Sequence, residues 1–389
     1  MSKQNETQLQ IALWFRQVGG MTLKEFPQLI RDRAVFVYIL YIFTLDIIIA
    51  AGANMELNNN KVIINDADQS QVSRELIYRF RAPYFDVVDT RMHPDEALRS
   101  LDQGDATLYL DIPVDFGETL QRGQEPAVIQ MLVDTSIANI GYLAASYGTR
   151  ISMELGDEWV APRMSAAGIA VTSLPRIDNQ KRIRFNPDIN EPWFSSISEL
   201  LAIITVACIF LPSIAMVREK ERGTFEQLLV SPLTPFQVMF SKIVAMMIVM
   251  LIGTALSLFT IMQPLFDVPL RGSLPLFFAL TALYAFATSG LGMLAATFAR
   301  NSGQLGMLLM LIVFPTIMLS GLWVQPESMP VWLQWIINLT PLRYFVDIAY
   351  GILLRGAGLD ILLDSVLKMT GIGIILFAFA LWRFRRQFR

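Results

Sequence analysis

The stretch VREKERGTFEQLLVSP, residues 217–232, determines the fold of this chain because of what lies on either side of it. Apolar runs at 194–217 and 238–263 flank it, and each is long enough to cross a bilayer. A charged stretch between two such runs is expected to form a short loop at the membrane face. Its arginine and lysine side chains favour the cytoplasmic side, so the sequence predicts a membrane protein with this loop in the cytoplasm.

The loop itself carries a helix signal. Thr224 followed by Gln227 has the spacing of a capping box, in which the two side chains satisfy free backbone N–H groups at a helix start. Pro232 then ends the helix after about two turns. We therefore expect a short helix near 218–231 that lies along the membrane surface. A second interpretation stays open, in which the basic residues only anchor an ordinary loop at the lipid headgroups.

The composition agrees with a membrane protein. The chain has 389 residues, of which 53% are hydrophobic and only 17% are charged. Soluble domains carry about a quarter charged residues, so an integral membrane protein is indicated. The net charge of −3 argues against a nucleic-acid-binding protein, which needs a basic face. One histidine and one cysteine are too few for a zinc site built from the usual ligands or for an internal disulfide.

Apolar runs recur along the rest of the chain. They predict an α-helical polytopic membrane protein with six transmembrane helices and both termini in the cytoplasm. Residues 1–33 have the pattern of an amphipathic helix in the cytoplasmic interface. Two apolar pieces near 326–355 are too short to span, which predicts short re-entrant helices in the outer leaflet. The expected spans are residues 34–53 and, within the segment 193–389, residues 194–217, 238–263, 274–298, 305–323 and 361–381.

Residues 54–192, between the first two spans, have the character of a soluble domain. Short β-type runs alternate there with helical stretches, which indicates an extracytoplasmic α/β domain with one mixed sheet. The run NDADQS at 65–70 has the alternating carboxylates of a metal loop but lacks the glycine and distal glutamate of a calcium hand, so Ser70 is interpreted as a helix cap. The expected strands are 62–64, 85–88, 107–112 and 128–133, and the expected helices are 70–80, 94–101, 113–122 and 136–155.

Asp46 lies within the first predicted span, on its outer half. A carboxylate inside a bilayer costs a few kcal/mol, so such a residue is a functional candidate. It is nearly alone as an intramembrane carboxylate in this sequence. An Asp that only hydrogen-bonds a neighbouring helix, or that is protonated there, fits equally well.

Motifs of several enzyme classes are missing. The sequence contains no Gly-x-x-x-x-Gly-Lys-Ser/Thr loop to hold nucleotide phosphates, no Gly-x-Ser-x-Gly elbow and no His-Glu-x-x-His pair. The chain is therefore not expected to be an enzyme or to bind a cofactor itself. An ion-coupled secondary transporter is one alternative, although duplicated halves are not evident. A membrane-anchored sensor with a periplasmic ligand domain is another, although no long cytoplasmic output segment follows.

The order of residues in the charged loop resembles a known family. The run REKERGTFEQLLVSPLTP at 218–235, followed by Ser241 and Lys242, is similar to the coupling-helix segment of permease subunits of bacterial ATP-binding-cassette type-2 exporters. The resemblance continues in MPVWLQ at 329–334, TPLRYF at 340–345 and RGAG at 355–358. It covers nearly the whole chain and is greatest for inner-membrane multidrug or lipid permeases with a large periplasmic domain. The polar residue Asp46 is atypical of the family's first span.

The resemblance implies a division of labour between subunits. Two permeases, identical or homologous, would form a dimer, and each would dock on a cytoplasmic ATPase that binds ATP and Mg²⁺. The resemblance also implies export across the bacterial inner membrane, and a periplasmic adaptor as a possible further partner. The residues it assigns to ATPase coupling are Glu219, Glu221, Arg222, Gly223, Thr224, Gln227 and Leu228.

The family's second and fifth spans line the path of the substrate at the dimer interface. In this chain those spans are almost wholly apolar, which favours hydrophobic or amphiphilic cargo such as drugs or lipids over sugars. Methionines at helical spacing can equally be plain packing. The residues assigned to the transport path are Asp46, Ser213, Met216, Pro315, Thr316 and Ser320.

Overall fold

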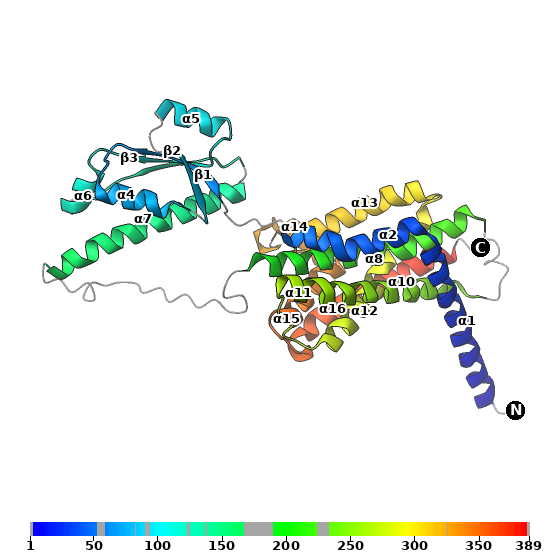
Figure 1. Ribbon diagram of the computed structural model, residues 1–389. Coiled ribbons are helices and arrows are strands. Elements are labelled where there is room, and N and C mark those ends of the chain that lie inside the picture. The colour runs from blue at the N-terminus through cyan, green and yellow to red at the C-terminus, as the bar shows by residue number, and fades with distance from the viewer. Residues whose placement is uncertain are drawn as a thin grey trace. The chain divides into compact units, whose positions relative to one another are not determined.

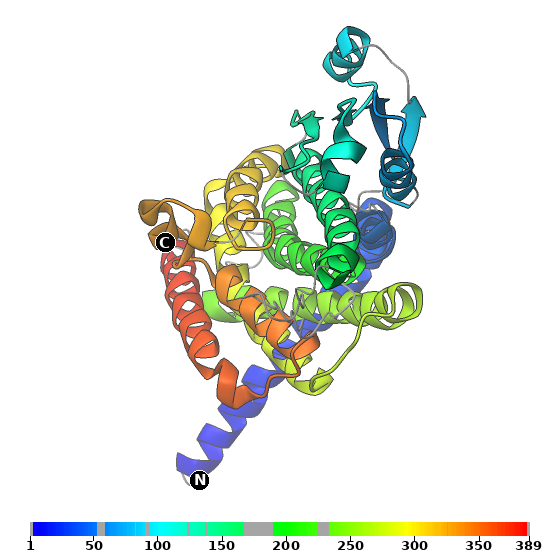
Figure 2. The same cartoon turned by 90° about the vertical axis from the view of Figure 1, so that its left-hand side faces the viewer.

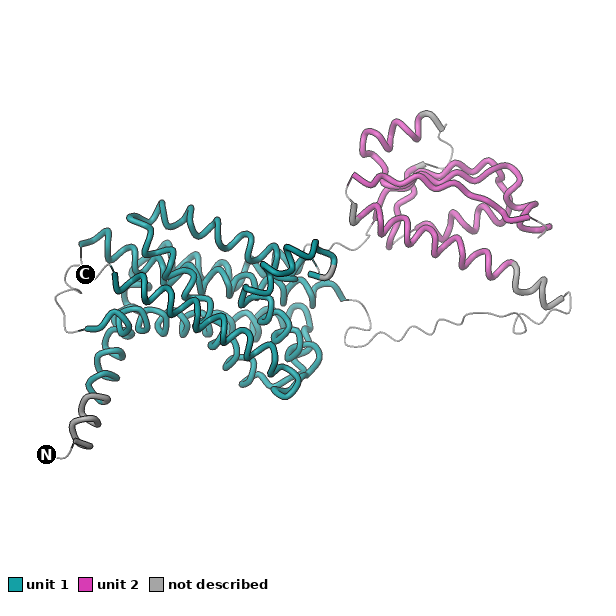
Figure 3. Tube along the Cα trace, turned by 180° about the vertical axis from the view of Figure 1, so that it is seen from behind, with its two compact units in different colours: residues 1–54, 182–389 teal, residues 55–181 magenta. Residues whose placement is uncertain are grey.

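A computed structural model describes residues 3–52, 59–81, 83–89, 94–122, 125–136, 138–166, 190–223, 233–324 and 326–386 (Figure 1). The chain divides into two compact units (Figure 3). Unit 1 combines Met1–Asn54 with Arg182–Arg389, and unit 2 is Met55–Lys181. Unit 2 falls within the separate domain predicted at 54–192.

Unit 1 is a helical bundle. In chain order its elements are α1 (Lys3–Arg31), α2 (Arg33–Tyr41), the π-helical segment η1 (Ile42–Asp46), α3 (Ile47–Gly52), α8 (Glu191–Glu221), α10 (Pro235–Ser257), the π-helical segment η3 (Leu258–Met262), α11 (Gln263–Phe266), α12 (Leu274–Phe298), α13 (Ser302–Met318), the 3₁₀ turn η4 (Pro326–Ser328), α14 (Val331–Ile337), α15 (Pro341–Leu353) and α16 (Leu359–Arg385). Figure 1 shows α1 running across the direction of the other long helices, as an interfacial helix would.

Five helical stretches in the described part of the chain are long and apolar enough to cross a membrane. They are Arg33–Gly52, Glu191–Glu221, Pro235–Phe266, Leu274–Phe298 and Leu359–Arg385. Each coincides with a predicted span. The remaining predicted span, 305–323, corresponds to α13, which is apolar but shorter at 17 residues. The structure is therefore that of a multi-span helical membrane protein, and the sixth span stays a prediction.

Helix α8 lies inside the bundle, with other helices around it when the unit is viewed along the helix axes (Figure 2). In the most apolar stretch of α8, 83% of the residues are buried, compared with 33% in that of the first span. Glycines allow its neighbours to approach closely. A Cβ placed on Gly292 of α12 would lie 2.1 Å from the carbonyl oxygen of Ile209 in α8, and one on Gly373 of α16 would lie 2.3 Å from the Cβ of Ala287 in α12.

Short elements lie at one end of the helical bundle (Figure 1). α14 and α15 coincide with the two short helices predicted near 326–355, and their prediction as helices is confirmed. The indole rings of Trp332 and Trp335 are exposed on α14, as is common where a protein meets the membrane–water interface. The hydroxyl of Tyr344 on α15 donates a hydrogen bond to the backbone carbonyl of Asn338 at 2.9 Å. This bond holds the turn between the two helices.

Unit 2 has the predicted α/β architecture with one mixed sheet. Its strand order is β2-β1-β3-β4; β1 is parallel to β2 and β3, and β4 is antiparallel to β3. Alternate side chains such as Val62 and Ile64 face one helical layer, and Ile63 and Tyr109 face the other. The strands are β1 (Asn60–Asp66), β2 (Phe85–Asp89), β3 (Leu108–Ile112) and β4 (Gln130–Val133), and the helices are α4 (Gln71–Arg79), α5 (Pro94–Asp102), α6 (Phe116–Arg122) and α7 (Ala138–Ala166).

The acidic turn after β1 forms a helix cap. Ser70 Oγ accepts a hydrogen bond from the backbone N–H of Ser73 at 3.1 Å, which confirms it as the cap of α4. Asp66 accepts from the N–H of Gln69 at 2.9 Å, and Asp68 accepts from the N–H of Gly117 at 3.0 Å. The carboxylates therefore hold the turn, and the described residues contain no group of three side chains able to bind a metal ion.

The close contact of α8 with α12 predicts the effect of enlarging Gly292. Leucine there would meet the backbone of Ile209, so we expect Gly292→Leu to lower the free energy of unfolding by about 1–3 kcal/mol or more through overpacking. Gly371→Leu on α16 is the matched control, because nothing lies within 4 Å of its added Cβ. Thermal unfolding of the purified protein in detergent checks this; equal melting temperatures for the two variants would contradict the packing.

Candidate functional site

Helix α8 continues four residues beyond Val217 into the charged loop and ends at Glu221. Its end is set by Gly223, whose φ of 70° lies in the left-handed region that favours glycine, and whose N–H donates to the carbonyl of Lys220 at 3.2 Å. The predicted helix near 218–231 falls mainly outside the described residues. Thr224, Gln227 and Leu228 lie there, so their coupling role stays a prediction. A capping box does occur downstream, between Thr234 and Gln237 at the start of α10.

A buried cluster of charges lies at the last turn of α8. The side chain of Lys242 on α10 is 0% exposed, and its Nζ lies 2.8 Å from Oε1 of Glu25 on α1 and 2.9 Å from Oε1 of Glu219 on α8. Lys24 Nζ lies 3.2 Å from the same oxygen of Glu219. The four side chains carry two charges of each sign. A buried ammonium is tolerated only when it is paired, so the position of each helix is constrained by the other two.

The residues next to Glu219 bind the ends of three further helices. Lys220 Nζ donates to the carbonyl of Ala296 near the end of α12 at 2.7 Å. Glu221 accepts from the backbone N–H of Ser302 at 2.6 Å and from its hydroxyl at 2.8 Å, so it satisfies free donors at the start of α13. Arg218 forms an ion pair with Asp32, the cap of α2. Displacing the last turn of α8 therefore acts on every one of these helix ends.

Helix α1 is held along α10 by more than the ion pairs. Gln237 Nε2 donates to Oε1 of Gln17 at 2.8 Å, and the Thr22 hydroxyl donates to the carbonyl of Ser241 at 3.4 Å. The ring of Trp14 lies 6.0 Å from that of Phe240. These contacts extend over more than two turns of α1, so its inner part is docked on the bundle.

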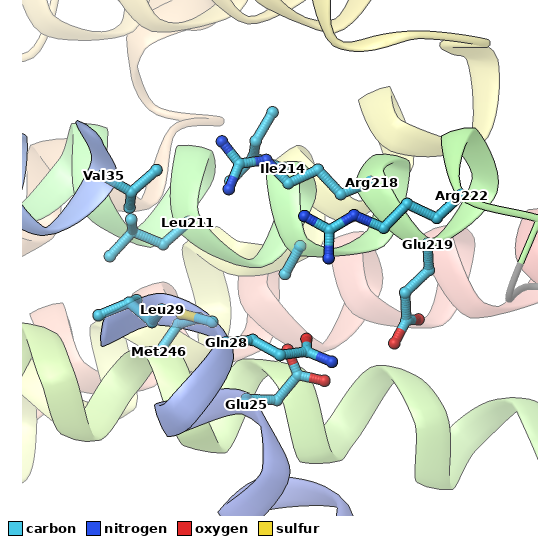
Figure 4. A pocket seen from close by; sticks show the side chains of 11 residues that line it. Glu25, Gln28, Leu29, Val35, Leu211, Ile214, Arg218, Glu219, Arg222 and Met246 are labelled. Atoms are coloured by element: carbon cyan, nitrogen blue, oxygen red, sulfur yellow. The ribbon is translucent and has the colours of Figure 1, made fainter. Parts of the chain in front are cut away.

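A pocket opens between α1, α2, α8 and α10 beside the cluster (Figure 4). One end of it is apolar, and the other carries charged side chains. Figure 4 shows the side chains of Arg218 and Arg222 extending along α8 in the same direction, with Gln28 and Glu25 across from them on α1. The lining residues are Glu25, Gln28, Leu29, Val35, Leu211, Ile214, Ala215, Arg218, Glu219, Arg222 and Met246.

The match to a known family covers nearly the whole chain. The sequence model described as "ABC-2 family transporter protein" matches residues 34–382, which include the charged loop, the buried cluster apart from its α1 residues, and unit 2. The chain belongs to the ABC-2 transporter family.

Two relatives named as transport permeases match this chain over nearly their full lengths. It is 35% identical over 372 residues to the "Inner membrane transport permease YhhJ" of Escherichia coli K12, covering 95% of this chain and 97% of that protein. It is 30% identical over 380 residues to the "Probable multidrug ABC transporter permease YbhR" of the same strain, covering 96% and 99%. The protein is thus an ABC transporter permease and a multi-pass membrane protein.

The residues assigned to the transport path do not gather at this pocket. Ser213 and Met216 on α8 are buried, and so are Thr316 on α13 and Ser320 just beyond it, while Pro315 is exposed. The three hydroxyl groups donate to carbonyls of residues three or four positions earlier, so they are satisfied within their own segments. Their role in transport stays a prediction.

Asp46 has a partner that the sequence analysis overlooked. Its carboxyl group in η1 lies within interaction range of that of Glu199 in α8, so the interpretation of Asp46 as nearly alone is wrong. The approach of the two groups agrees with the alternative that Asp46 only bonds to a neighbouring helix, and a role of Asp46 in transport stays a prediction. Glu199 could have been found as an acidic residue within the second apolar run.

The buried cluster also contains residues that the sequence analysis did not single out. Lys242 was noted only as part of the family pattern, and Glu25 was included only in the amphipathic pattern of residues 1–33. The signal was present in the lysine itself, because a cation inside an apolar span requires a partner. The predicted docking of Glu219 on the ATPase is untested; its carboxylate has partners within this chain.

Lys242→Met should destabilise the permease strongly, because Glu25 is then left buried without its ammonium partner and Glu219 keeps only Lys24. We expect a loss of about 3–5 kcal/mol in the free energy of unfolding. Lys368→Met is the matched control, because its pair with Asp364 is exposed and such surface pairs add little to stability.

A second variant separates charge from size. Lys242→Met combined with Glu25→Gln and Glu219→Gln removes all three charges and should recover much of the lost stability. The measurement is denaturant unfolding of the purified permease. Equal loss in the single and triple variants would show that volume, and not charge pairing, matters at this position.

Proposed function

We propose that this chain is the membrane-spanning subunit of an ATP-driven exporter that moves hydrophobic or amphiphilic compounds out across the bacterial inner membrane. A separate cytoplasmic ATPase, which binds ATP and Mg²⁺, would supply the energy. The observation that carries the proposal is the last turn of α8, where Glu219, Lys220 and Glu221 contact α1, α10, α12 and α13 at once. A partner that moves the loop after Gly223 would move all of these helices together.

The proposed topology has six spans, with α13 as the fifth, and both termini in the cytoplasm. Unit 2 then lies in the periplasm, where it could receive an adaptor protein. In support, the charged end of α8 and the arginines Arg383 and Arg385 at the end of α16 would face the cytoplasm, in agreement with the positive-inside rule.

A dimer of permeases is part of the proposal. One face of α13 carries large apolar side chains that are 64–76% exposed in the single chain, namely Met307, Met310, Leu311 and Phe314. This face would pack against a second copy or a homologue, and the substrate would pass beside it. An apolar lining of this kind favours drug-like or lipid-like compounds, as the word "multidrug" in the name of one relative suggests for that protein.

The carboxyl pair of Asp46 and Glu199 favours a second candidate, in which a proton gradient contributes to transport. The two candidates differ in their energy source. Uptake into inverted membrane vesicles, which corresponds to export from the cell, supports the ATPase-driven exporter if it needs ATP and survives a protonophore. Uptake that stops with the protonophore while ATP is present supports the ion-coupled candidate.

Gly223→Pro should uncouple the permease from its ATPase. Proline fixes φ near −65° and cannot adopt the 70° that this position requires, so the loop leaves α8 in a different direction. We expect insertion into the membrane to persist while ATP-dependent efflux falls at least about tenfold. The measurement is efflux, together with recovery of a cassette ATPase when tagged permease is purified in mild detergent.

Gly104→Pro in unit 2 is the control for the backbone change, because Gly104 has a similar φ of 75°. It should leave ATPase recovery intact. Absence of any ATPase from the wild-type purification would contradict the proposed function, and normal efflux by Gly223→Pro would contradict the coupling role of this loop.

A further inference from the structure

We propose that the pocket between α1, α2, α8 and α10 binds an anionic phospholipid, with the lipid phosphate between Arg218 and Arg222. The proposal uses the membrane orientation of the proposed function, in which this pocket opens at the cytoplasmic leaflet. It adds a ligand site that transport by an ABC permease does not itself require.

The two arginines are placed to bind one phosphate together. Arg218 lies in the last turn of α8 and Arg222 is the C-cap residue four positions later, so they lie about one turn apart on the same face. Both side chains line the pocket (Figure 4). Guanidinium groups bind phosphate oxygens through two parallel hydrogen bonds, which makes a pair of arginines a typical phosphate site. The side-chain amide of Gln28 lines the pocket opposite them and can donate to the same group.

The carboxylates around the pocket are already paired with other cations. The carboxylates of Glu25 and Glu219 point to Lys242, and Glu219 also meets Lys24. Asp32 pairs with Arg218, so it offsets that charge. Glu221 lies near both arginines but is bonded to Ser302, and Lys220 next to it offsets its charge.

Arg222 is therefore the cation left over. Among the described residues its guanidinium forms no ion pair, although α8 holds it at the wall of the pocket. The pocket and the residues paired with its lining contain five cations and four carboxylates. The cations are Lys24, Arg218, Lys220, Arg222 and Lys242, and the carboxylates are those of Glu25, Asp32, Glu219 and Glu221. One excess positive charge favours an anionic ligand over a cationic or zwitterionic one.

The apolar half of the pocket favours a lipid over a free anion. Leu29, Val35, Leu211, Ile214 and Met246 line it beyond the arginines. Free phosphate gains nothing from such a lining, whereas an acyl chain loses its contact with water there. The pocket also sits at the bend around Asp32, where α1 turns across the bundle and α2 begins to run along it (Figure 1). Helices change direction in this way at the headgroup level of a bilayer, which is the depth of a lipid phosphate.

A bound lipid would join parts of the chain that the buried cluster also joins. Its phosphate would hold the last two turns of α8, and its chain would fill the space next to α2 and α10. Occupancy would therefore stabilise the bend between α1 and α2 and the end of α8, and anionic lipid content would affect the stability of the region next to the coupling loop.

The test measures lipid binding to the purified, delipidated full-length permease by native mass spectrometry. Phosphatidylglycerol and phosphatidylcholine with identical acyl chains are compared, and inorganic phosphate is added as a competitor. We expect phosphatidylglycerol to bind about tenfold more tightly than phosphatidylcholine in the wild type. Arg222→Gln should reduce this preference to about twofold or less.

Two further variants make the result specific to this pocket. Ala215→Leu fills it without changing any charge and should weaken binding of both lipids. Arg300→Gln removes an exposed arginine at the turn after α12, on the same end of the bundle as Ser302 and Glu221, and should leave binding unchanged.

Equal affinity for the two lipids, or an equal loss of preference in Arg300→Gln, would overturn the proposal, because either result indicates a general surface effect. Displacement of phosphatidylglycerol by millimolar inorganic phosphate would overturn the lipid as the occupant. The assay uses neither ATPase nor transport, so its failure leaves the proposed function standing. Conversely, a missing ATPase in the purification would leave a positive lipid result intact.

Discussion

The ammonium group of Lys242 is the constraint on which the arrangement of helices around the charged loop depends. It is fully buried in a bundle that is otherwise largely apolar, and an isolated charge there would cost many kcal/mol. Two carboxylates from different helices, Glu25 and Glu219, remove that cost. The helices α1, α8 and α10 are therefore tied together at one point, at the last turn of α8.

The chain changes character abruptly beyond this point. Up to Glu221, the last turn of α8 is bonded side chain by side chain to its neighbours, so it cannot shift alone. At Gly223 the backbone takes a left-handed conformation, and the chain leaves the helix. A rigid helix end followed by a glycine is well suited to transmit a displacement from outside the bundle. Because the last turn of α8 is bonded to several helices, its movement would shift those helices together.

The parts of the fold that follow from local patterns could be predicted from the sequence. Apolar runs predicted the spans, short β-type runs predicted the four strands, and Ser70 was found as a cap because capping depends on neighbouring residues alone. The pairing of Lys242 with Glu25 could not be predicted in the same way, since 217 residues separate them and only tertiary packing joins them. The same holds for Asp46 and Glu199, whose carboxyl groups approach each other where two spans meet.

The reason for using charges at this point is better explained by specificity than by stability. An apolar trio of the same volume can be as stable as a buried ion network, so stability alone does not require Lys242. An apolar face, however, accepts a partner helix in several rotations. Shifting α1 by one residue would turn Glu25 by about 100° and leave the ammonium without one of its carboxylates. Only one docking of α1 satisfies the cluster, and that docking sets the bend at Asp32 and the position of Glu219 beside the loop.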